Sequence, residues 1–213
     1  MIHKLKFDTG GSLGVFPQCF GSTYVPPPSF VDSLLGTKCL IEGDVPVIEF
    51  ELDKYAKFTD VISGPVSLIG GIGQGKFICS NRFINLLLEE FYDVRYQVFP
   101  CYVSNEHSRK AYNLISLYSY GDLEIDYPQS KLSTRVYIKG KRKESIIKNV
   151  NSFDDLENLS IKKVFAKEII FKRDAEPAGI FILRDIFTHE MFCTDEFWEK
   201  YTKLKLTGLK LVA

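Results

Sequence analysis

Apolar and polar residues follow the same order in two stretches of the chain, residues 77–99 and 191–212. In each stretch an apolar run ends in the sequence Cys-[Ser/Thr]-[Asn/Asp]-x-Phe, which begins at Cys79 and again at Cys193. The second residue of this sequence, Ser80 or Thr194, is of a type that caps helices, because its hydroxyl accepts a hydrogen bond from a first-turn N–H. The pattern predicts a repeated strand–helix–strand unit.

Apolar residues recur at helical spacing after each predicted cap. They are Phe83, Leu87 and Phe91 in the first stretch and Phe197, Tyr201 and Leu204 in the second. Alternating apolar and polar residues then predict an exit strand in both. The first turn of the second helix carries Asp195 and Glu196, which suit the positive end of a helix dipole. Glu89 and Glu90 lie near the C-terminal end of the first helix, where the dipole disfavours them.

Further strands are predicted where branched and aromatic residues gather. Residues 2–7 are predicted to form an edge strand, and residues 45–52 a strand with Val47 at the centre of its half-buried face. The other predicted strands are 112–120, 132–138, 165–171 and 179–183. Ser152 is predicted to cap a short helix that carries Phe153, Leu156 and Leu159 on one face. Together these elements predict an α+β fold with mixed or antiparallel sheets and short helices. We expect an N-terminal extension (1–44) packed on the core and two α+β halves (45–120 and 121–213), which can also form one compact domain.

Composition narrows the class of protein. Hydrophobic residues make up 45% of the chain and no apolar run has the length of a membrane span, which indicates a soluble globular protein. The 27 basic and 27 acidic side chains cancel, so no net field favours nucleic acid or an anionic membrane. The five cysteines lack CxxC spacing, and the N-terminus lacks the apolar core of a signal peptide. We expect a cytoplasmic location.

Two segments resemble phosphate sites. Residues 70–76, GGIGQGK, fit the first part of a phosphate-binding loop, but Phe77 replaces the hydroxyl residue and a strand, not a helix, is predicted next. We favour a loop between strands, in which the glycines supply positive φ. The basic residues Lys139, Lys141, Arg142 and Lys143 surround a predicted hairpin turn at Gly140. A solvated turn is favoured there over a phosphate site.

The segment 121–130, GDLEIDYPQS, is the most suggestive polar string. Asp122, Glu124 and Asp126 are spaced by two, so on an extended backbone their carboxylates share one face. Such a face can protect a sheet edge or attract a basic partner. It can also ligate a divalent metal or supply an acid–base pair, which is the less favoured interpretation.

Catalytic patterns are otherwise missing from the sequence. The three histidines are isolated and no G-x-S-x-G elbow is present. Cys79 and Cys193 precede helix starts, where a thiol can become reactive, but both end apolar runs and are predicted to be core residues. We therefore expect no catalytic, cofactor-binding or metal-binding residue and a protein that is not an enzyme.

The chain resembles the two-part immunity proteins of bacterial polymorphic toxin systems, a family long catalogued as of unknown function. The resemblance covers residue 45 to the C-terminus and includes a "hydrophobic–[ST]–[DE]–x–Phe … T-G-L-x-hydrophobic" unit at the end. The residues that carry it are 112–114, 124–126 with Ser130, 169–171 and 191–211 including Thr207-Gly208-Leu209. Glu124 stands where the family string carries a cysteine.

This resemblance implies a cytoplasmic, non-enzymatic α+β protein that binds one cognate toxin and blocks it. The candidate partner-binding residues are Asp122, Glu124, Asp126 and Ser130. Neither a membrane nor a nucleic acid is expected as a partner. Two alternatives stay open: a metal-dependent enzyme that uses residues 122–126, and a nucleotide-binding or nucleic-acid-binding protein that uses residues 70–76 or 139–143.

Overall fold

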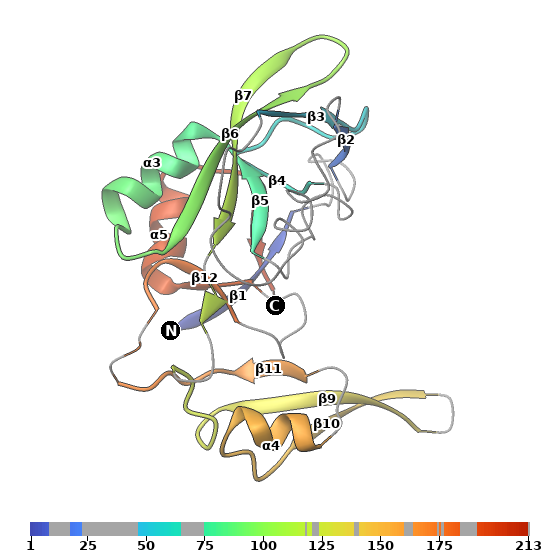
Figure 1. Cartoon of the computed structure of the whole chain (residues 1–213), viewed down its shortest axis with the longest axis vertical. Helices are drawn as coiled ribbons and strands as arrows, with labels where there is room; N and C mark the ends of the chain where they lie inside the picture. The colour runs from blue at the N-terminus through green and yellow to red at the C-terminus, as the bar shows by residue number, and fades with distance from the viewer. Residues whose placement is uncertain are drawn as a thin grey trace. The chain divides into compact units, whose positions relative to one another are not determined.

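The structure is a computed structural model that describes residues 1–8, 18–22, 47–64, 75–117, 119–120, 124–138, 141–159, 164–173, 175, 177–183 and 191–212. Short helices and antiparallel and mixed sheets give the α+β class predicted from the sequence (Figure 1). The chain divides into two compact units. Unit 1 comprises Met1–Tyr118, Ala178–Ile182 and His189–Ala213, and unit 2 comprises Ser119–Pro177 and Leu183–Thr188. This division differs from the predicted halves, because the second strand–helix–strand stretch belongs to unit 1.

The described strands of unit 1 form two sheets. Their bounds are β1 Ile2–Phe7, β2 Cys19–Ser22, β3 Ile48–Leu52, β4 Val61–Ile62, β5 Lys76–Cys79, β6 Tyr96–Ser104, β7 Arg109–Leu117, β12 Ile180–Leu183, β13 Met191–Thr194 and β14 Leu209–Leu211. One sheet has the order β2-β3-β6-β7-β5-β4, and within unit 1 the other has the order β14-β1-β13-β12.

The repeated strand–helix–strand unit is present in both predicted stretches. Helix α3, Asn81–Glu90, lies between β5 and β6, and helix α5, Asp195–Lys203, lies between β13 and β14. The N-caps have the same extended conformation, and in each the hydroxyl oxygen accepts a hydrogen bond of 3.3 Å from the N–H three residues later. The shared sequence Cys-[Ser/Thr]-[Asn/Asp]-x-Phe therefore encodes the same helix start twice.

The two repeats also share a strand arrangement that the sequence did not indicate. Strand β7 lies between β5 and β6 and is antiparallel to both. Strand β1 lies between β13 and β14 and is antiparallel to both. In each repeat the strands before and after the helix are therefore parallel to each other and separated by one antiparallel strand.

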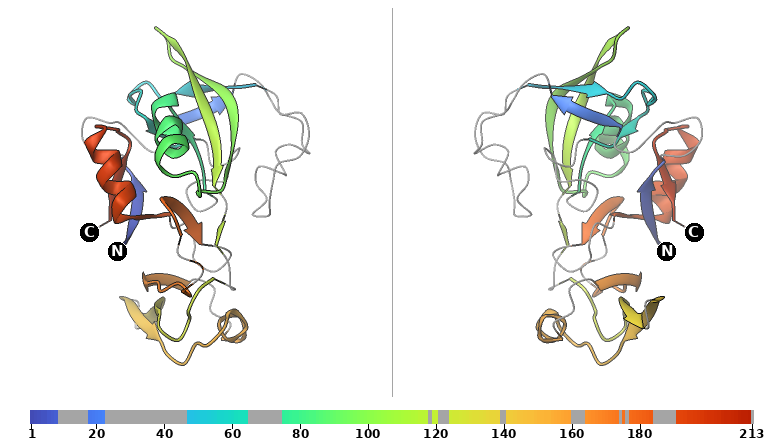
Figure 2. Two further views of the ribbon diagram at one scale, coloured as in Figure 1. Left: turned by 90° about the vertical axis from the view of Figure 1, so that its left-hand side faces the viewer. Right: turned by 90° about the vertical axis from the view of Figure 1, so that its right-hand side faces the viewer.

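The helices of the two repeats pack against each other through aromatic side chains. The Phe83 ring centroid lies 6.1 Å from that of Phe197 and 6.4 Å from that of Tyr201, and the Phe91 centroid lies 5.4 Å from that of Phe197. Figure 2 shows α3 and α5 from two sides. Buried residues from both repeats and from β1 belong to one cluster, which includes Leu5, Phe7, Phe77, Cys79, Leu87, Cys193 and Leu209. The repeats thus share a single core.

Four positional predictions are wrong. Leu159, predicted on the apolar face of the helix capped by Ser152, lies after the last helical residue, Asn158, and is 49% exposed. Strand β1 is an interior strand and not an edge strand, because it pairs on both sides and buries Leu5 and Phe7. Val47 is 55% exposed, since the inward face of β3 is formed by Ile48, Phe50 and Leu52, one residue out of the predicted register. Leu204 is 46% exposed because it ends α5 instead of continuing its buried face.

Unit 2 contains strands β8 Ser119–Tyr120, β9 Lys131–Ile138, β10 Lys141–Ile147 and β11 Val164–Glu168, and helix α4 Phe153–Asn158. Strands β10, β9 and β11 form an antiparallel sheet in that order. Ile138 pairs with Lys141, which confirms the predicted hairpin, although residues 139–140 lie outside the described residues. Ser152 Oγ accepts a hydrogen bond of 3.2 Å from Asp155 N, as its predicted capping role requires.

Candidate functional site

The acidic string of unit 2 forms a fixed turn and not a continuous extended segment. Ile125 makes a single antiparallel bridge to Phe171, and residues 127–129 form a turn. Asp126 Oδ2 accepts a hydrogen bond of 2.8 Å from Gln129 Nε2, and Asp126 Oδ1 accepts one of 3.3 Å from Gln129 N. The Asp126 carboxylate therefore holds the turn that follows it.

Ser130 and Glu124 tie this turn to the chain around Ile170. Ser130 Oγ donates to Asp126 O at 2.7 Å and accepts from Ile170 N at 3.0 Å. The backbone oxygen of Glu124 accepts a hydrogen bond of 2.8 Å from Lys172 N. We name the segment 124–130, with its contacts to residues 170–172, the acid turn.

The acid turn unites three of the four predicted partner-binding residues. Glu124, Asp126 and Ser130 are all partly exposed, whereas Asp122 lies outside the described residues. Glu124 and Asp126 flank the bridged Ile125, which is buried. The turn therefore places two partly exposed acidic residues on either side of a buried one.

A metal site needs more ligands than this pair. Among the residues that the structure describes, no group of three or more His, Cys, Asp or Glu side chains is placed to hold a metal ion. Within the same residues, no helix is both long and apolar enough to cross a membrane.

The glycine-rich segment ends in a strand and not at a helix. Residues 70–74 lie outside the described residues, and Lys76 begins β5 with only 3% of its surface exposed. Helix α3 starts at Asn81, so the strand residues after Lys76 separate this lysine from the helix N-terminus. Burial lowers the pKa of Lys76 to about 8. A phosphate-binding loop instead places its lysine at the start of a helix whose amides face the phosphates.

The cysteines selected from the sequence are core residues, as predicted. Cys79 and Cys193 are fully buried and carry free thiols. Burial raises the pKa of Cys193 to about 12, with a smaller contribution from Asp195, and raises the pKa of Cys79 well above its ordinary value. Because the thiolate is the nucleophilic form, these thiols are poor nucleophiles at neutral pH.

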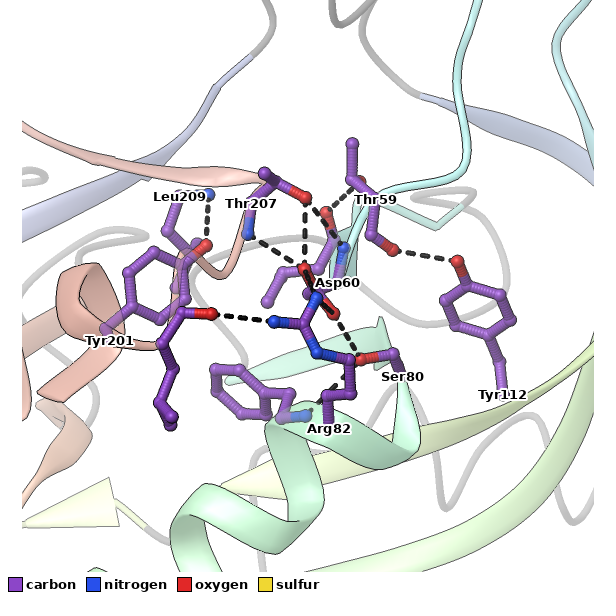
Figure 3. Close-up of polar contacts among 11 residues, drawn as sticks. Thr59, Asp60, Ser80, Arg82, Tyr112, Tyr201, Thr207 and Leu209 are labelled. Carbon is purple, nitrogen blue, oxygen red and sulfur yellow. Dashed lines mark hydrogen bonds and ion pairs between the residues drawn. The ribbon is translucent and has the colours of Figure 1, made fainter.

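A second polar cluster lies in unit 1 around Asp60, which is 7% exposed (Figure 3). Asp60 Oδ1 accepts a hydrogen bond of 2.7 Å from Ser80 Oγ. Asp60 Oδ2 accepts bonds from Thr207 N at 3.0 Å and from Thr207 Oγ1 at 3.1 Å. Arg82 Nη1 lies 3.4 Å from the same carboxylate, and Arg82 Nη2 donates to Leu204 O at 2.7 Å. We name these residues the Asp60 cluster.

The Asp60 cluster connects the start of α3 with the turn after α5. The backbone reinforces this connection, because Ser80 N donates to Asp60 O at 2.8 Å and Val61 N donates to Thr207 O at 2.9 Å. Ser80 Oγ also accepts the capping bond from Phe83 N, so its hydroxyl is engaged both as donor and as acceptor. This geometry suits a structural link between the repeats more than a nucleophile and its base.

Asp60 is not among the residues predicted from the sequence. Its partner Thr207 is 147 residues away, and no local pattern connects them. The one available signal was an aspartate followed at once by the apolar pair Val61-Ile62, which indicates a carboxylate near the core.

Comparison with models of known protein families gives no match to this chain, and a search of curated proteins finds no relative.

Proposed function

We propose that this chain is an immunity protein of a bacterial polymorphic toxin system, which binds one cognate toxin and neutralises it by stoichiometric protein–protein interaction. The observation that carries the proposal is the acid turn, where Glu124 and Asp126 are partly exposed on a backbone held by Ser130 and Ile170. The motifs that resemble immunity proteins support the same function. In this proposal the chain has no enzymatic activity.

A fixed turn suits a recognition surface. A segment that is already ordered loses less conformational entropy when it binds, so more of its interaction energy appears as affinity. Two carboxylates on such a segment attract a basic partner over several ångströms, which mainly raises the rate of association. An immunity protein benefits from rapid association, because it must bind the toxin before the toxin acts.

The cytoplasm is the proposed location. The four described cysteines, Cys19, Cys79, Cys101 and Cys193, are buried and free, which fits a reducing compartment. A toxin that enters or is made in this compartment is accessible to the protein without export.

Co-expression with a neighbouring toxin gene tests the proposal. We expect the wild-type chain to restore growth of cells that make the toxic C-terminal domain encoded beside it. The purified proteins should form a complex of fixed stoichiometry by calorimetry and size-exclusion chromatography. If the wild-type chain protects against no neighbouring toxin, the proposed function is wrong.

A charge-neutral variant tests the acid turn itself. The triple change Asp122→Asn, Glu124→Gln and Asp126→Asn removes the charges, while the new amide at position 126 keeps an oxygen that can accept the Gln129 N–H. We expect slower association with the toxic domain and a weaker dependence of the rate on salt. A control with the same loss of charge is Glu106→Gln, Asp154→Asn and Glu199→Gln, all at exposed positions. Equal rates for the two triple variants would show that the acid turn is not a contact.

A further inference from the structure

The last turn of α3 and the turn that follows the helix carry exposed apolar and acidic side chains. Leu88 is 62% exposed and Tyr92 is 82% exposed. Leu88 lies in the last turn of α3, which ends at Glu90, and Tyr92 lies in the turn that follows the helix. Glu89 and Asp93 are exposed beside them. An isolated exposed leucine is ordinary, but a large apolar pair within an acidic rim is typical of interaction surfaces.

Helix α5 provides an internal reference for this face. The ungapped alignment that pairs Cys79 with Cys193 also pairs Leu88 with Thr202 and Glu89 with Lys203. Thr202 and Lys203 are exposed too, and Thr202 Oγ1 donates to Trp198 O at 2.9 Å. The repeated fold is therefore compatible with a polar, basic helix end. The packing of the repeat therefore does not itself require the apolar and acidic residues at positions 88 and 89.

The electrostatics of the two helix ends differ in the same way. The last turn of α5 carries Lys200 and Lys203, which complement the negative end of its dipole. The last turn of α3 carries no basic residue and two glutamates. Glu90 is compensated by Lys200 Nζ at 2.6 Å, but Glu89 points outward from the exposed end of the helix, where the final carbonyl oxygens add further negative potential. Lysine or arginine side chains of a partner would complement this end.

We infer that Leu88, Glu89, Tyr92 and Asp93, the α3 end face, dock into a cleft of the cognate toxin that is lined with lysine and arginine and has an apolar floor. The inference rests on the proposed function and specifies its contact. Clefts of this kind hold the phosphates of nucleic acids, so the partner is a toxin that acts on nucleic acid. The acidic rim takes the place of phosphates, and the tyrosine and leucine fill the floor of the cleft.

Two double variants separate the apolar and charged contributions. Leu88→Ala with Tyr92→Ala removes the apolar anchors, and we expect dissociation from the toxic domain encoded by the neighbouring gene to become about 10- to 100-fold faster, on the order of hot-spot anchors. Glu89→Gln with Asp93→Asn removes the charges, and we expect slower association and a flatter salt dependence with little change in dissociation. Because all four side chains are exposed, both variants should remain folded, which circular dichroism and thermal melting would verify.

The matched control is the double variant Thr202→Ala with Lys203→Gln on the corresponding face of α5. It should leave the association and dissociation rates within about two-fold of wild type, because exposed residues outside a contact contribute little.

The outcomes distinguish this inference from the proposed function. If the wild-type chain binds and protects but both α3 variants behave like the control, the α3 end face is not the contact and the immunity function still stands. If the wild-type chain neither binds nor protects, the proposed function fails and this inference with it. If the neutralised toxin proves to act on a membrane or a protein through a cleft without basic residues, the assignment of partner class is wrong.

Discussion

The repeats β5-α3-β6 and β13-α5-β14 begin alike and end differently. Both helices start with a hydroxyl cap and bury a phenylalanine three residues later, Phe83 in one and Phe197 in the other. At its end α3 is acidic and passes into the nine-residue strand β6, whereas α5 is basic and passes into the three-residue strand β14. The starts lie in the common core, where the two phenylalanine rings meet, so packing restricts their residue types. The outer residues of the helix ends, Leu88 and Glu89 in one and Thr202 and Lys203 in the other, are exposed, so packing restricts their residue types less.

The exit of the second repeat depends on backbone conformations that the first does not use. Lys205 and Gly208 have φ of 52° and 107°, while Phe91, which ends α3, has φ of −137°. This turn brings Thr207 to Asp60, just before β4. The second repeat therefore contacts the first through its exit turn. Substitutions in this turn should distinguish the two repeats most strongly.

The largest effect is expected for Gly208→Ala. An alanine Cβ would lie 2.0 Å from Val61 O, a backbone atom that cannot move aside alone, and φ of 107° is unfavourable for any side chain. We expect a loss of more than about 3 kcal/mol in the free energy of unfolding, measured in urea. Gly75→Ala is the control, because its Cβ meets the end of the Ile182 side chain at 2.8 Å, which can shift. An equal loss in both variants would mean that the exit turn is not a tight contact.

Asp60→Ala should have the next largest effect. It leaves the hydroxyls of Ser80 and Thr207 and the Thr207 N–H without their buried acceptor. We expect a loss of about 3 kcal/mol in unfolding free energy, since these partly buried donors lose their hydrogen bonds to a charged acceptor. Arg82→Ala is the matched variant at the rim. Its side chain is 60% exposed, so its loss should cost under about 1 kcal/mol. If Arg82→Ala proves the more costly change, the cluster is organised by its cation and not by Asp60.

Lys76→Met replaces the buried ammonium group at the start of β5, in the first repeat, by an apolar side chain of similar length. Burial lowers the pKa of Lys76 from 10.5 to about 8, so between these values the unfolded chain binds more protons than the folded one. Raising the pH through this range therefore favours the folded wild-type protein relative to the variant. We expect Lys76→Met to be more stable at neutral pH by on the order of 2 kcal/mol.

The advantage of the Lys76→Met variant should shrink as the pH rises from 8 to 10.5. The measurement is the difference in unfolding free energy between the two proteins, because buried cysteines and tyrosines also titrate and cancel in that difference. A constant difference across this range would show that Lys76 is solvated in the folded state.

The smallest effects are expected at the two caps. Thr194→Ala should cost about 1 kcal/mol of unfolding free energy, as for other capping hydroxyls. Ser80→Ala should cost more, since Ser80 Oγ also donates to Asp60 at 2.7 Å. In an Asp60→Asn background this excess should fall, and a double-mutant cycle measures it. Equal costs in both backgrounds would mean that the two caps are energetically alike.

Local patterns predicted the parts of this fold that local interactions determine. The caps Ser80 and Thr194, the β9–β10 hairpin and the burial of Cys79 and Cys193 follow from neighbouring residues and are confirmed. The register of β3 was misplaced because Val47 and Ile48 are both apolar and either could face inward. A period of two cannot choose between adjacent apolar residues.

Long-range partners account for what the sequence did not predict. Strand β1 lies between strands that are distant in the sequence, as the pairing of Ile2 with Thr194 shows, and Asp60 bonds to Thr207. At the acid turn the sequence showed the closely spaced Glu124 and Asp126, but the contacts of Ser130 with Ile170 could not be read from that spacing. The α3 end face was visible only as two glutamates at an unfavourable helix end. Its exposed apolar pair required the structure.

The position of β1 determines when unit 1 can be completed during synthesis. This strand leaves the ribosome before the other described strands, yet its partners β13 and β14 are Met191–Thr194 and Leu209–Leu211. Until those residues are made, the buried face of β1, with Leu5 and Phe7, has no sheet to join. Unit 2 is encoded between these pairing segments and can fold earlier, because its described strands β9, β10 and β11 pair with one another. The nascent chain therefore carries an unpaired apolar strand while residues 8–190 are translated, a period in which chaperones or aggregation compete with folding.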